Sequence, residues 1–221
     1  MEKVLPKLKV DVYSDVVCPW CFIGAERLRQ VLGSLPEPMD IELSYKTYLL
    51  DPGVPAEGRD LAKRLEAKYG RSAAEIFARP TEAARELGLP LDFAKVPMSY
   101  NSLNAHTLMR HAAPDQQAAL ARALFEAYFL QGKNISQEEV LLPLATAHGF
   151  SADQVKGLLA DEGERNATLL AANDTQKLGI HGVPTYVFND RVGFSGAQPE
   201  AIFRQAIAES LESGASGALK N

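Results

Sequence analysis

Cysteine is nearly absent from this sequence. Of the 221 residues only Cys18 and Cys21 are cysteines, and the chain has four histidines. A structural zinc site usually has four cysteine or histidine ligands, so this pair would need two more. The histidines include no pair four residues apart, and we expect no metal site; they are His106, His111, His148 and His181.

Long apolar runs and basic clusters are missing as well. No stretch approaches the roughly 18 apolar residues of a membrane span. The first residues, MEKVLPKLKVDVYSD, are too charged for a secretory signal. The net charge of −5 does not favour binding to phosphate groups. We therefore expect a cytoplasmic protein without membrane or nucleic-acid partners.

Both cysteines fall within one motif, CPWC. A permanent disulfide across so short a loop would constrain the unfolded chain very little. A chain of this length buries a sizeable core without one. In a reducing compartment, cysteines are more often reactive or metal-bound than crosslinked. The interpretation we favour is a redox pair, with the Cys18–Cys21 disulfide in place of a cofactor.

The first third of the chain predicts a strand, a helix and a second strand. Residues 7–13 alternate between apolar and polar, as in a half-buried strand. We expect Ser14 and Asp15 to cap a helix over 18–35. Residues 40–50 alternate again before turn residues end the strand. Together they indicate a parallel crossover unit.

The middle of the chain, 59–179, predicts helices almost throughout. Most segments open on Ser, Asp or Pro and several close on Gly, which are helix start and stop signals. We expect Pro80 and Pro143 to break or kink two of them. One short extended piece is expected over 89–102. The helical segments are 59–70, 72–88, 102–113, 114–132, 136–149 and 151–163.

The end of the chain returns to strands after a helix over 165–180. Residues 184–189 and 191–196 flank the turn Asn189–Asp190 and predict a hairpin. An amphipathic helix over 198–214 follows.

Without the helical middle, this order of elements is that of a thioredoxin fold. We predict an α/β protein: a thioredoxin fold with an inserted all-helical domain. Residues 1–58 and 165–221 would form the discontinuous thioredoxin-like domain, and residues 59–164 the insertion.

The CPWC motif suits dithiol exchange. Cys18 falls where the strand ends and the helix begins, where unpaired N–H groups and the helix dipole favour a thiolate. Pro19 suits the first helical turn. Cys21 lies one turn further on the same face and is placed to resolve a mixed disulfide. Trp20 offers less to a thiolate than a histidine would, and Asp15 opposes it, so we expect only moderate activation of Cys18.

A second informative stretch, GIHGVPTYVF, spans residues 179–188. Val183 and Pro184 precede a strand at the place where a thioredoxin fold carries its cis-proline loop. Such a loop leaves backbone free to pair with an extended substrate, although Pro184 also suits the mere start of a strand. Gly182 gives the loop conformational freedom. His181 is either near the thiols or simply solvated.

These stretches, SDVVCPWCFIGAERL and GIHGVPTYVFNDRVGFSGAQP, with SYNSLNAHTLMRHA between them, resemble the DsbA family and its FrnE-like branch. The resemblance implies protein thiol–disulfide oxidoreductase activity, with Cys18 as nucleophile and Cys21 as resolving thiol. It also implies that Pro184, in the Gly-Val-Pro-Thr loop that ends at Thr185, is the cis-proline, and that Val183 offers backbone to the substrate.

The sequence departs from the family's pattern at two positions. Trp20 stands where DsbA has histidine, which argues against a strongly oxidising potential. Val12 stands where relatives have an acidic proton-relay residue, and Asp11 has the wrong strand parity. We considered Lys46 as a buried cation in its place.

Three functions stay open at this stage. The first is a thiol–disulfide oxidoreductase, acting in either direction on protein or small disulfides, with glutathione as a possible co-substrate and a homodimer as a possible assembly. The second is a glutathione-dependent enzyme resembling kappa-class transferases and 2-hydroxychromene-2-carboxylate isomerases, with ligand contacts from Asn101, Asn104 and His106. The third is a chaperone-like binder with an apolar groove at Leu124, Phe125, Tyr128 and Phe129, a cluster that also suits core packing.

Overall fold

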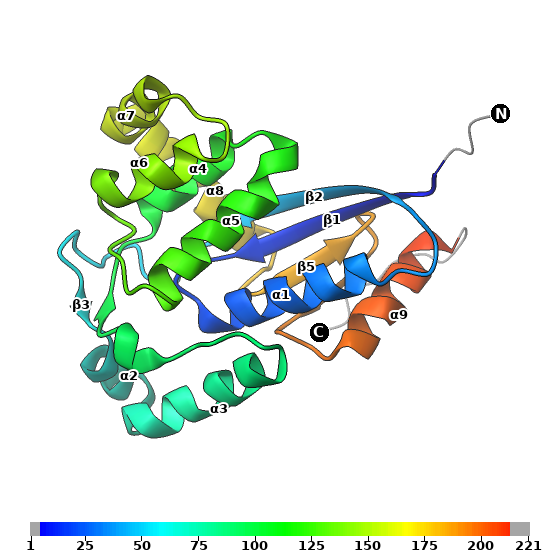
Figure 1. Cartoon of the computed structure of the whole chain (residues 1–221), viewed down its shortest axis with the longest axis horizontal. Coiled ribbons are helices and arrows are strands. Elements are labelled where there is room, and N and C mark those ends of the chain that lie inside the picture. Colours follow the sequence, from blue (N-terminus) through cyan, green and yellow to red (C-terminus); the bar gives the residue numbers. More distant parts are fainter. Residues whose placement is uncertain (1–4, 213–221) are drawn as a thin grey trace.

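The computed structural model describes residues 5–212 and contains a four-stranded sheet with the order β2-β1-β5-β6 (Figure 1). β1 and β2 are parallel, while β5 is antiparallel to both β1 and β6. The predicted α/β class and thioredoxin fold are confirmed. The strands are β1 (Lys7–Ser14), β2 (Asp40–Thr47), β5 (Thr185–Phe188) and β6 (Val192–Ser195).

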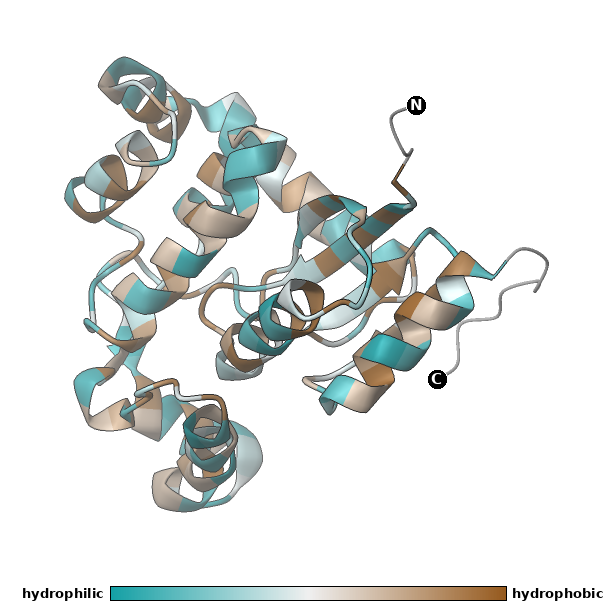
Figure 2. Cartoon of the chain, turned by 45° about the vertical axis from the view of Figure 1, so that its right-hand side comes forward, coloured by the Kyte–Doolittle hydropathy of each residue, from teal (hydrophilic) through white to brown (hydrophobic). Residues whose placement is uncertain are grey.

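Helices α1 (Pro19–Gly33) and α9 (Glu200–Leu211) cover one face of this sheet. The alternation in β1 points Leu8, Val10 and Val12 toward them, where all three are buried with aromatic side chains of β5 and α9. Figure 2 shows hydrophobic and hydrophilic residues alternating along both helices, as expected of helices with one buried face. The predicted end of the last helix, 213–214, lies outside the described residues.

The helical insertion divides into two groups in space (Figure 1). Helices α2 and α3 lie beside the amino-terminal end of α1, and the others stack over the end of the sheet. The insertion's helices are α2 (Leu61–Tyr69), α3 (Ala73–Glu86), α4 (Leu103–His111), α5 (Pro114–Phe129), α6 (Glu138–Thr146), α7 (Ala152–Ala160) and α8 (Glu162–Lys177).

An aromatic cluster joins the insertion to α1. The ring of Phe22 stacks on those of Phe125 and Phe129, with centroids 5.4 and 5.7 Å apart. Leu124 and Tyr128 are buried with them. These side chains form core, and Tyr128 and Phe129 also line the cleft beside the CPWC motif.

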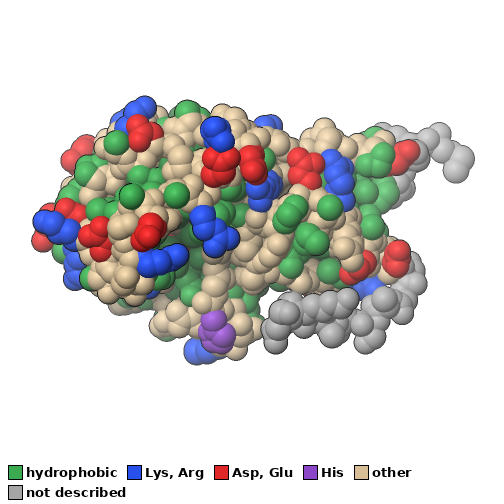
Figure 3. All heavy atoms as spheres, turned by 90° about the horizontal axis from the view of Figure 1, so that it is seen from below, with side chains coloured by type: hydrophobic (Ala, Val, Ile, Leu, Met, Phe, Trp, Pro, Cys, Tyr) green, Lys and Arg blue, Asp and Glu red, His purple; other side chains and the backbone are tan. Residues whose placement is uncertain are grey.

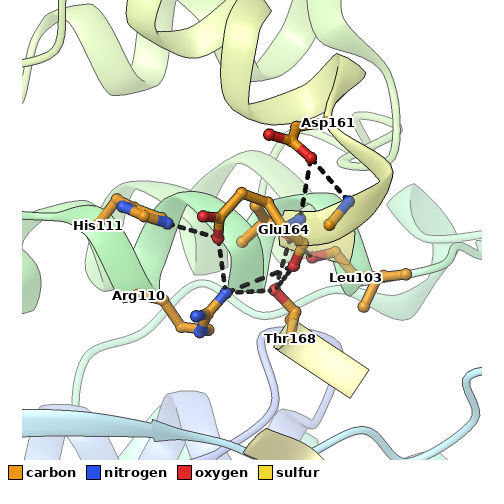
Figure 4. Close-up of polar contacts among 8 residues, drawn as sticks. Leu103, Arg110, His111, Asp161, Glu164 and Thr168 are labelled. Atoms are coloured by element: carbon orange, nitrogen blue, oxygen red, sulfur yellow. Dashed lines mark hydrogen bonds and ion pairs between the residues drawn. The ribbon is translucent and has the colours of Figure 1, made fainter. Parts of the chain in front are cut away.

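Polar contacts join α8 to α4 (Figure 4). Glu164 accepts hydrogen bonds from His111 at 2.7 Å and from Arg110 at 3.1 Å. These contacts, the His111 hydrogen bond foremost, lower the pKa of the Glu164 carboxyl. Asp161 caps α8 by accepting the N–H of Gly163. Because of this cap, α8 begins at residue 162, so the predicted domain boundary at 164/165 falls within a helix; the division into domains stays a prediction.

Two local predictions were wrong. Residues 59–60 form β3 (Arg59–Asp60) instead of opening a helix, because they pair with β4 (Met98–Ser99). The rest of the expected extended piece contains the 3-10 turn η1 (Phe93–Lys95). Pro80 and Pro143, which we expected to break or kink their helices, do not end them: Pro80 lies inside α3, where it is buried, and Pro143 lies inside α6.

Helix α5 seals the open edge of the sheet. β2 is an edge strand, so some of its backbone groups lack a neighbouring strand. The side chain of Gln117 accepts the N–H of Tyr45 at 2.7 Å and donates to the carbonyl of Met109 at 2.9 Å. One buried amide thus satisfies the strand and connects it to α4 and α5.

Among residues 5–212, no helix is both long and apolar enough to cross a bilayer.

We expect Gln117→Ala to lower the free energy of unfolding by about 1–3 kcal/mol, because the buried N–H of Tyr45 loses its acceptor. Gln116→Ala is the matched control, since the Gln116 side chain donates a hydrogen bond to Asp115 at the surface. Denaturant titration of both variants measures the difference, and equal stabilities would contradict this role for Gln117.

Candidate active site

Cys18 is the N-cap residue of α1, at the carboxyl end of β1. Its N–H donates to the carbonyl of Asp15 at 3.0 Å, and its own carbonyl accepts the N–H of Phe22 at 3.2 Å. Pro19 occupies the first helical position, and no side chain caps the helix. The expectation that Ser14 and Asp15 cap it was wrong, because the tight turn directs both side chains elsewhere. The uncapped helix end therefore faces Cys18 and favours negative charge there.

The Asp15 side chain is fully buried and holds the turn together. Its carboxylate accepts the N–H of Leu50 at 2.7 Å and that of Val17 at 3.4 Å. The Nε2 atom of His106, from α4, lies 3.2 Å from the same carboxylate. These three contacts connect the turn to the segment after β2 and to α4.

Cys21 lies behind Cys18, fully buried on the inner face of α1. Burial raises the pKa of the Cys21 thiol well above its usual value, and Cys18 raises that pKa further. The Ser14 hydroxyl and the backbone N–H of Asp15 act in the opposite direction. Apart from this sulfur, the Ser14 hydroxyl has no hydrogen-bond partner among the described residues. Cys21 is thus held as a thiol while Cys18 faces the opening.

The loop before β5 lies against Cys18. The Val183–Pro184 peptide bond is cis, and the sulfur of Cys18 is 3.9 Å from the carbonyl oxygen of Val183. Thr185 fastens the loop by donating to the carbonyl of Gly182 at 2.8 Å. His181 contributes its backbone, whose carbonyl accepts the hydroxyl of Tyr48 at 3.1 Å. Its side chain is exposed.

A cleft of about 350 Å³ opens beside the CPWC turn. Cys18, Pro19, Trp20 and Val183 lie at one end of it, and α2 and α3 line the other. Cys18 is only 4% exposed, but this small exposed surface faces the cleft. A substrate in the cleft therefore reaches Cys18 and is separated from Cys21 by α1.

The insertion residues that the sequence suggested as ligand contacts serve the protein itself. Asn101 donates to the carbonyls of Pro52 and Val54, and Asn104 donates to that of Ser136. The third of them, His106, contacts the buried carboxylate of Asp15.

Lys46 is not the buried cation that the sequence suggested. Its side chain is 39% exposed and lies 3.3 Å from the carboxylate of Asp11. Asp11 lies on the face of β1 that points away from α1, because it alternates with the buried Val10 and Val12. Lys46 lies on the same face of the neighbouring strand β2.

Comparison with known proteins identifies a family for this chain. Residues 9–208 match the family described as DSBA-like thioredoxin domain. The chain belongs to that family. It is 24% identical over 202 residues to the uncharacterized protein YwbO of Bacillus subtilis (strain 168), which covers 90% of this chain and 96% of that protein.

Two solved structures are similar to this member of the DSBA-like family. One, described as a probable DsbA oxidoreductase, SCO1869 from Streptomyces coelicolor, has a TM-score of 0.83 and 26% identity, covering 97% of this chain and 94% of that one. The other, a 2-hydroxychromene-2-carboxylate isomerase, has a TM-score of 0.69 and 17% identity over 91% and 95% of the two chains. The isomerase and this chain share the same fold.

Gly24 is a site residue that the sequence analysis missed. It lies on the face of α1 that packs against the cis-proline loop and β5. A Cβ atom at Gly24 would overlap the hydroxyl of Tyr186 and lie 3.2 Å from the Cγ atom of Pro184. A glycine inside an otherwise regular helix was the available signal, because glycine there costs about 1 kcal/mol relative to alanine unless packing requires it.

We expect Gly24→Ala to destabilise the protein by about 1–3 kcal/mol, because overpacking exceeds the gain in helix propensity. It should also slow the reactions of Cys18 by pushing α1 away from Pro184. The control is Gly33→Ala in the same helix, where a Cβ meets nothing within 4 Å. Thermal unfolding and the alkylation rate of Cys18 measure both effects, and a Gly24→Ala protein as stable as the control would contradict this packing.

Proposed function

We propose that this protein is a thiol–disulfide oxidoreductase in which Cys18 is the nucleophile and Cys21 the resolving thiol. The observation that carries the proposal is the separation of the two sulfurs. One lies at the amino-terminal end of α1 and at the end of a cleft, and the other is buried behind it. Membership of the DSBA-like family and the similarity to a probable DsbA oxidoreductase support this function.

The reaction proceeds in two exchanges when the protein acts as a reductant. The Cys18 thiolate attacks one sulfur of a substrate disulfide, forms a mixed disulfide and releases a thiolate that takes up a proton. The Cys21 thiolate then attacks the Cys18 sulfur and releases the second half of the substrate. Two electrons and two protons pass from the dithiol to the substrate, and the Cys18–Cys21 disulfide remains.

The loop opposite Cys18 positions the substrate in this proposal. Val183 presents backbone beside the Cys18 sulfur, so that an extended chain can pair with it as an added strand. Pro184 and Thr185 keep the loop in place, and Trp20 and Pro19 form the rim of the cleft. His181 affects the loop through its backbone.

We place the protein in the cytoplasm, acting as a reductase or isomerase on protein or small disulfides. Cytosolic glutathione keeps an oxidising dithiol largely reduced, which favours electron flow from the protein to its substrates. Glutathione is also a suitable co-substrate, because it can re-reduce the Cys18–Cys21 disulfide.

Trapping of mixed disulfides tests the assignment of the two thiols. Cys21→Ser should accumulate covalent adducts with disulfide substrates, because the resolving step is lost, whereas Cys18→Ser should form none. Mass spectrometry of the unreduced proteins detects the adducts. Equal trapping by the two variants would contradict the assignment, and glutathione-dependent isomerisation that persists in Cys18→Ala would favour the isomerase alternative.

The resolving step should depend on pH in one direction. Because burial raises the pKa of Cys21, its thiolate is scarce at neutral pH. The rate of the second exchange should therefore rise about tenfold per pH unit up to that pKa. Ser14→Ala should slow this step at neutral pH, since the hydroxyl lowers the same pKa. Stopped-flow measurement of the second released thiol checks both effects, and a rate independent of pH would contradict them.

A further inference from the structure

The cleft beside Cys18 carries positive charge although the whole chain has a net charge of −5. One wall of the cleft is formed by α2, α3 and the turn between them. This wall contributes a single acidic side chain, Glu75, and four basic ones: Arg64, Lys68, Arg71 and Arg79. The charge of the cleft is thus opposite to that of the molecule.

Most of this positive charge has no ion-pair partner within the described part of the chain. Arg64 pairs with Asp51 at 2.9 Å. Among residues 5–212, no ion pair involves Lys68, Arg71 or Arg79. Lys68 lies over an aromatic ring next to it in sequence, 5.4 Å from the centroid. The one acidic residue of the wall, Glu75, already accepts hydrogen bonds from Ser72 in the capping box of α3.

The floor of the cleft is apolar. Figure 3 shows the face from which α2 and α3 are seen, with Lys and Arg side chains, interspersed with Asp and Glu, around a hollow whose interior is hydrophobic. The volume of about 350 Å³ falls within the usual range of about 300–1,000 Å³ for small-molecule sites. The apolar side chains of this floor are Leu61, Leu65, Ile76, Phe77 and Phe93.

We infer that this cleft selects small disulfides that carry carboxylate groups. The unpaired cations attract the carboxylates, the apolar floor accommodates the carbon skeleton, and the disulfide bond meets Cys18 at the end of the cleft. This inference rests on the proposed function and adds the class of substrate. The chemistry is the two-step exchange already described: one small disulfide becomes two thiols as the Cys18 and Cys21 thiols become a disulfide.

Three small disulfides of different charge test the selection with the reduced protein in single turnover. Oxidised glutathione is anionic, hydroxyethyl disulfide is neutral and cystamine is cationic. Each rate constant is divided by the rate constant for the reaction of the same compound with free dithiothreitol. The resulting ratio should be highest for oxidised glutathione, lower for hydroxyethyl disulfide and lowest for cystamine. Added salt should slow the reaction with oxidised glutathione relative to that with the neutral compound, because it screens the attraction.

Charge reversal locates the effect. Arg71→Glu/Arg79→Glu should lower the ratio of the rate for oxidised glutathione to that for hydroxyethyl disulfide about tenfold or more. Arg71→Gln/Arg79→Gln should lower it less. Lys7→Glu/Lys156→Glu makes the same change in net charge at exposed positions outside the cleft and should leave the ratio as it is in the original protein.

Each outcome decides a separate point. An unchanged ratio in both arginine variants would overturn the inference and leave the oxidoreductase function standing. A charge effect seen only with a disulfide-linked acidic peptide would overturn the assignment to small disulfides. Failure of the original protein to react with any of the three compounds would overturn the inference, and failure to reduce a protein disulfide as well would contradict the proposed function itself.

Discussion

A buried carboxylate at the end of the first strand holds the active-site turn in place. Asp15 accepts hydrogen bonds from the N–H of Val17, within the turn, and from the N–H of Leu50, in the segment after β2. The side chain of His106, from the helical insertion, contacts the same carboxylate. A buried carboxylate is stable only when such partners are present. The three contacts therefore connect the strand, the crossover and the insertion at the point where α1 begins, and they fix the direction in which Cys18 projects.

The insertion serves the site in two ways. Its larger helical group supports α1 from behind through Phe22 and supplies the histidine that contacts the buried carboxylate. Its smaller group, α2 and α3, forms the wall of the cleft in front of Cys18. A thioredoxin fold alone would present the same two thiols on an open surface. The insertion encloses that surface and gives it charge and shape, so selectivity and reactivity arise from different parts of the chain.

The sequence predicted the parts of this arrangement that depend on local patterns. Alternation in residues 7–13, the position of Cys18 at a strand end and the spacing to Cys21 were enough to predict the fold and the reactive motif. Contacts between distant segments were not predictable in this way. Nothing near Asp15 in sequence indicates that His106 contacts it, or that Tyr186 leaves no room for a side chain at Gly24. The pairing of residues 59–60 with 98–99 also depends on segments that meet only in the folded chain.

The central claim is that the two thiols are made unequal by position, one at a helix end facing a cleft and one buried behind it. Competitive alkylation of the reduced native protein with a limiting amount of iodoacetamide, followed by peptide mass spectrometry, measures this most directly. The account predicts that nearly all the label is on Cys18, and that Cys21 is labelled only after unfolding. Label distributed evenly between the two cysteines, or found first on Cys21, would contradict it.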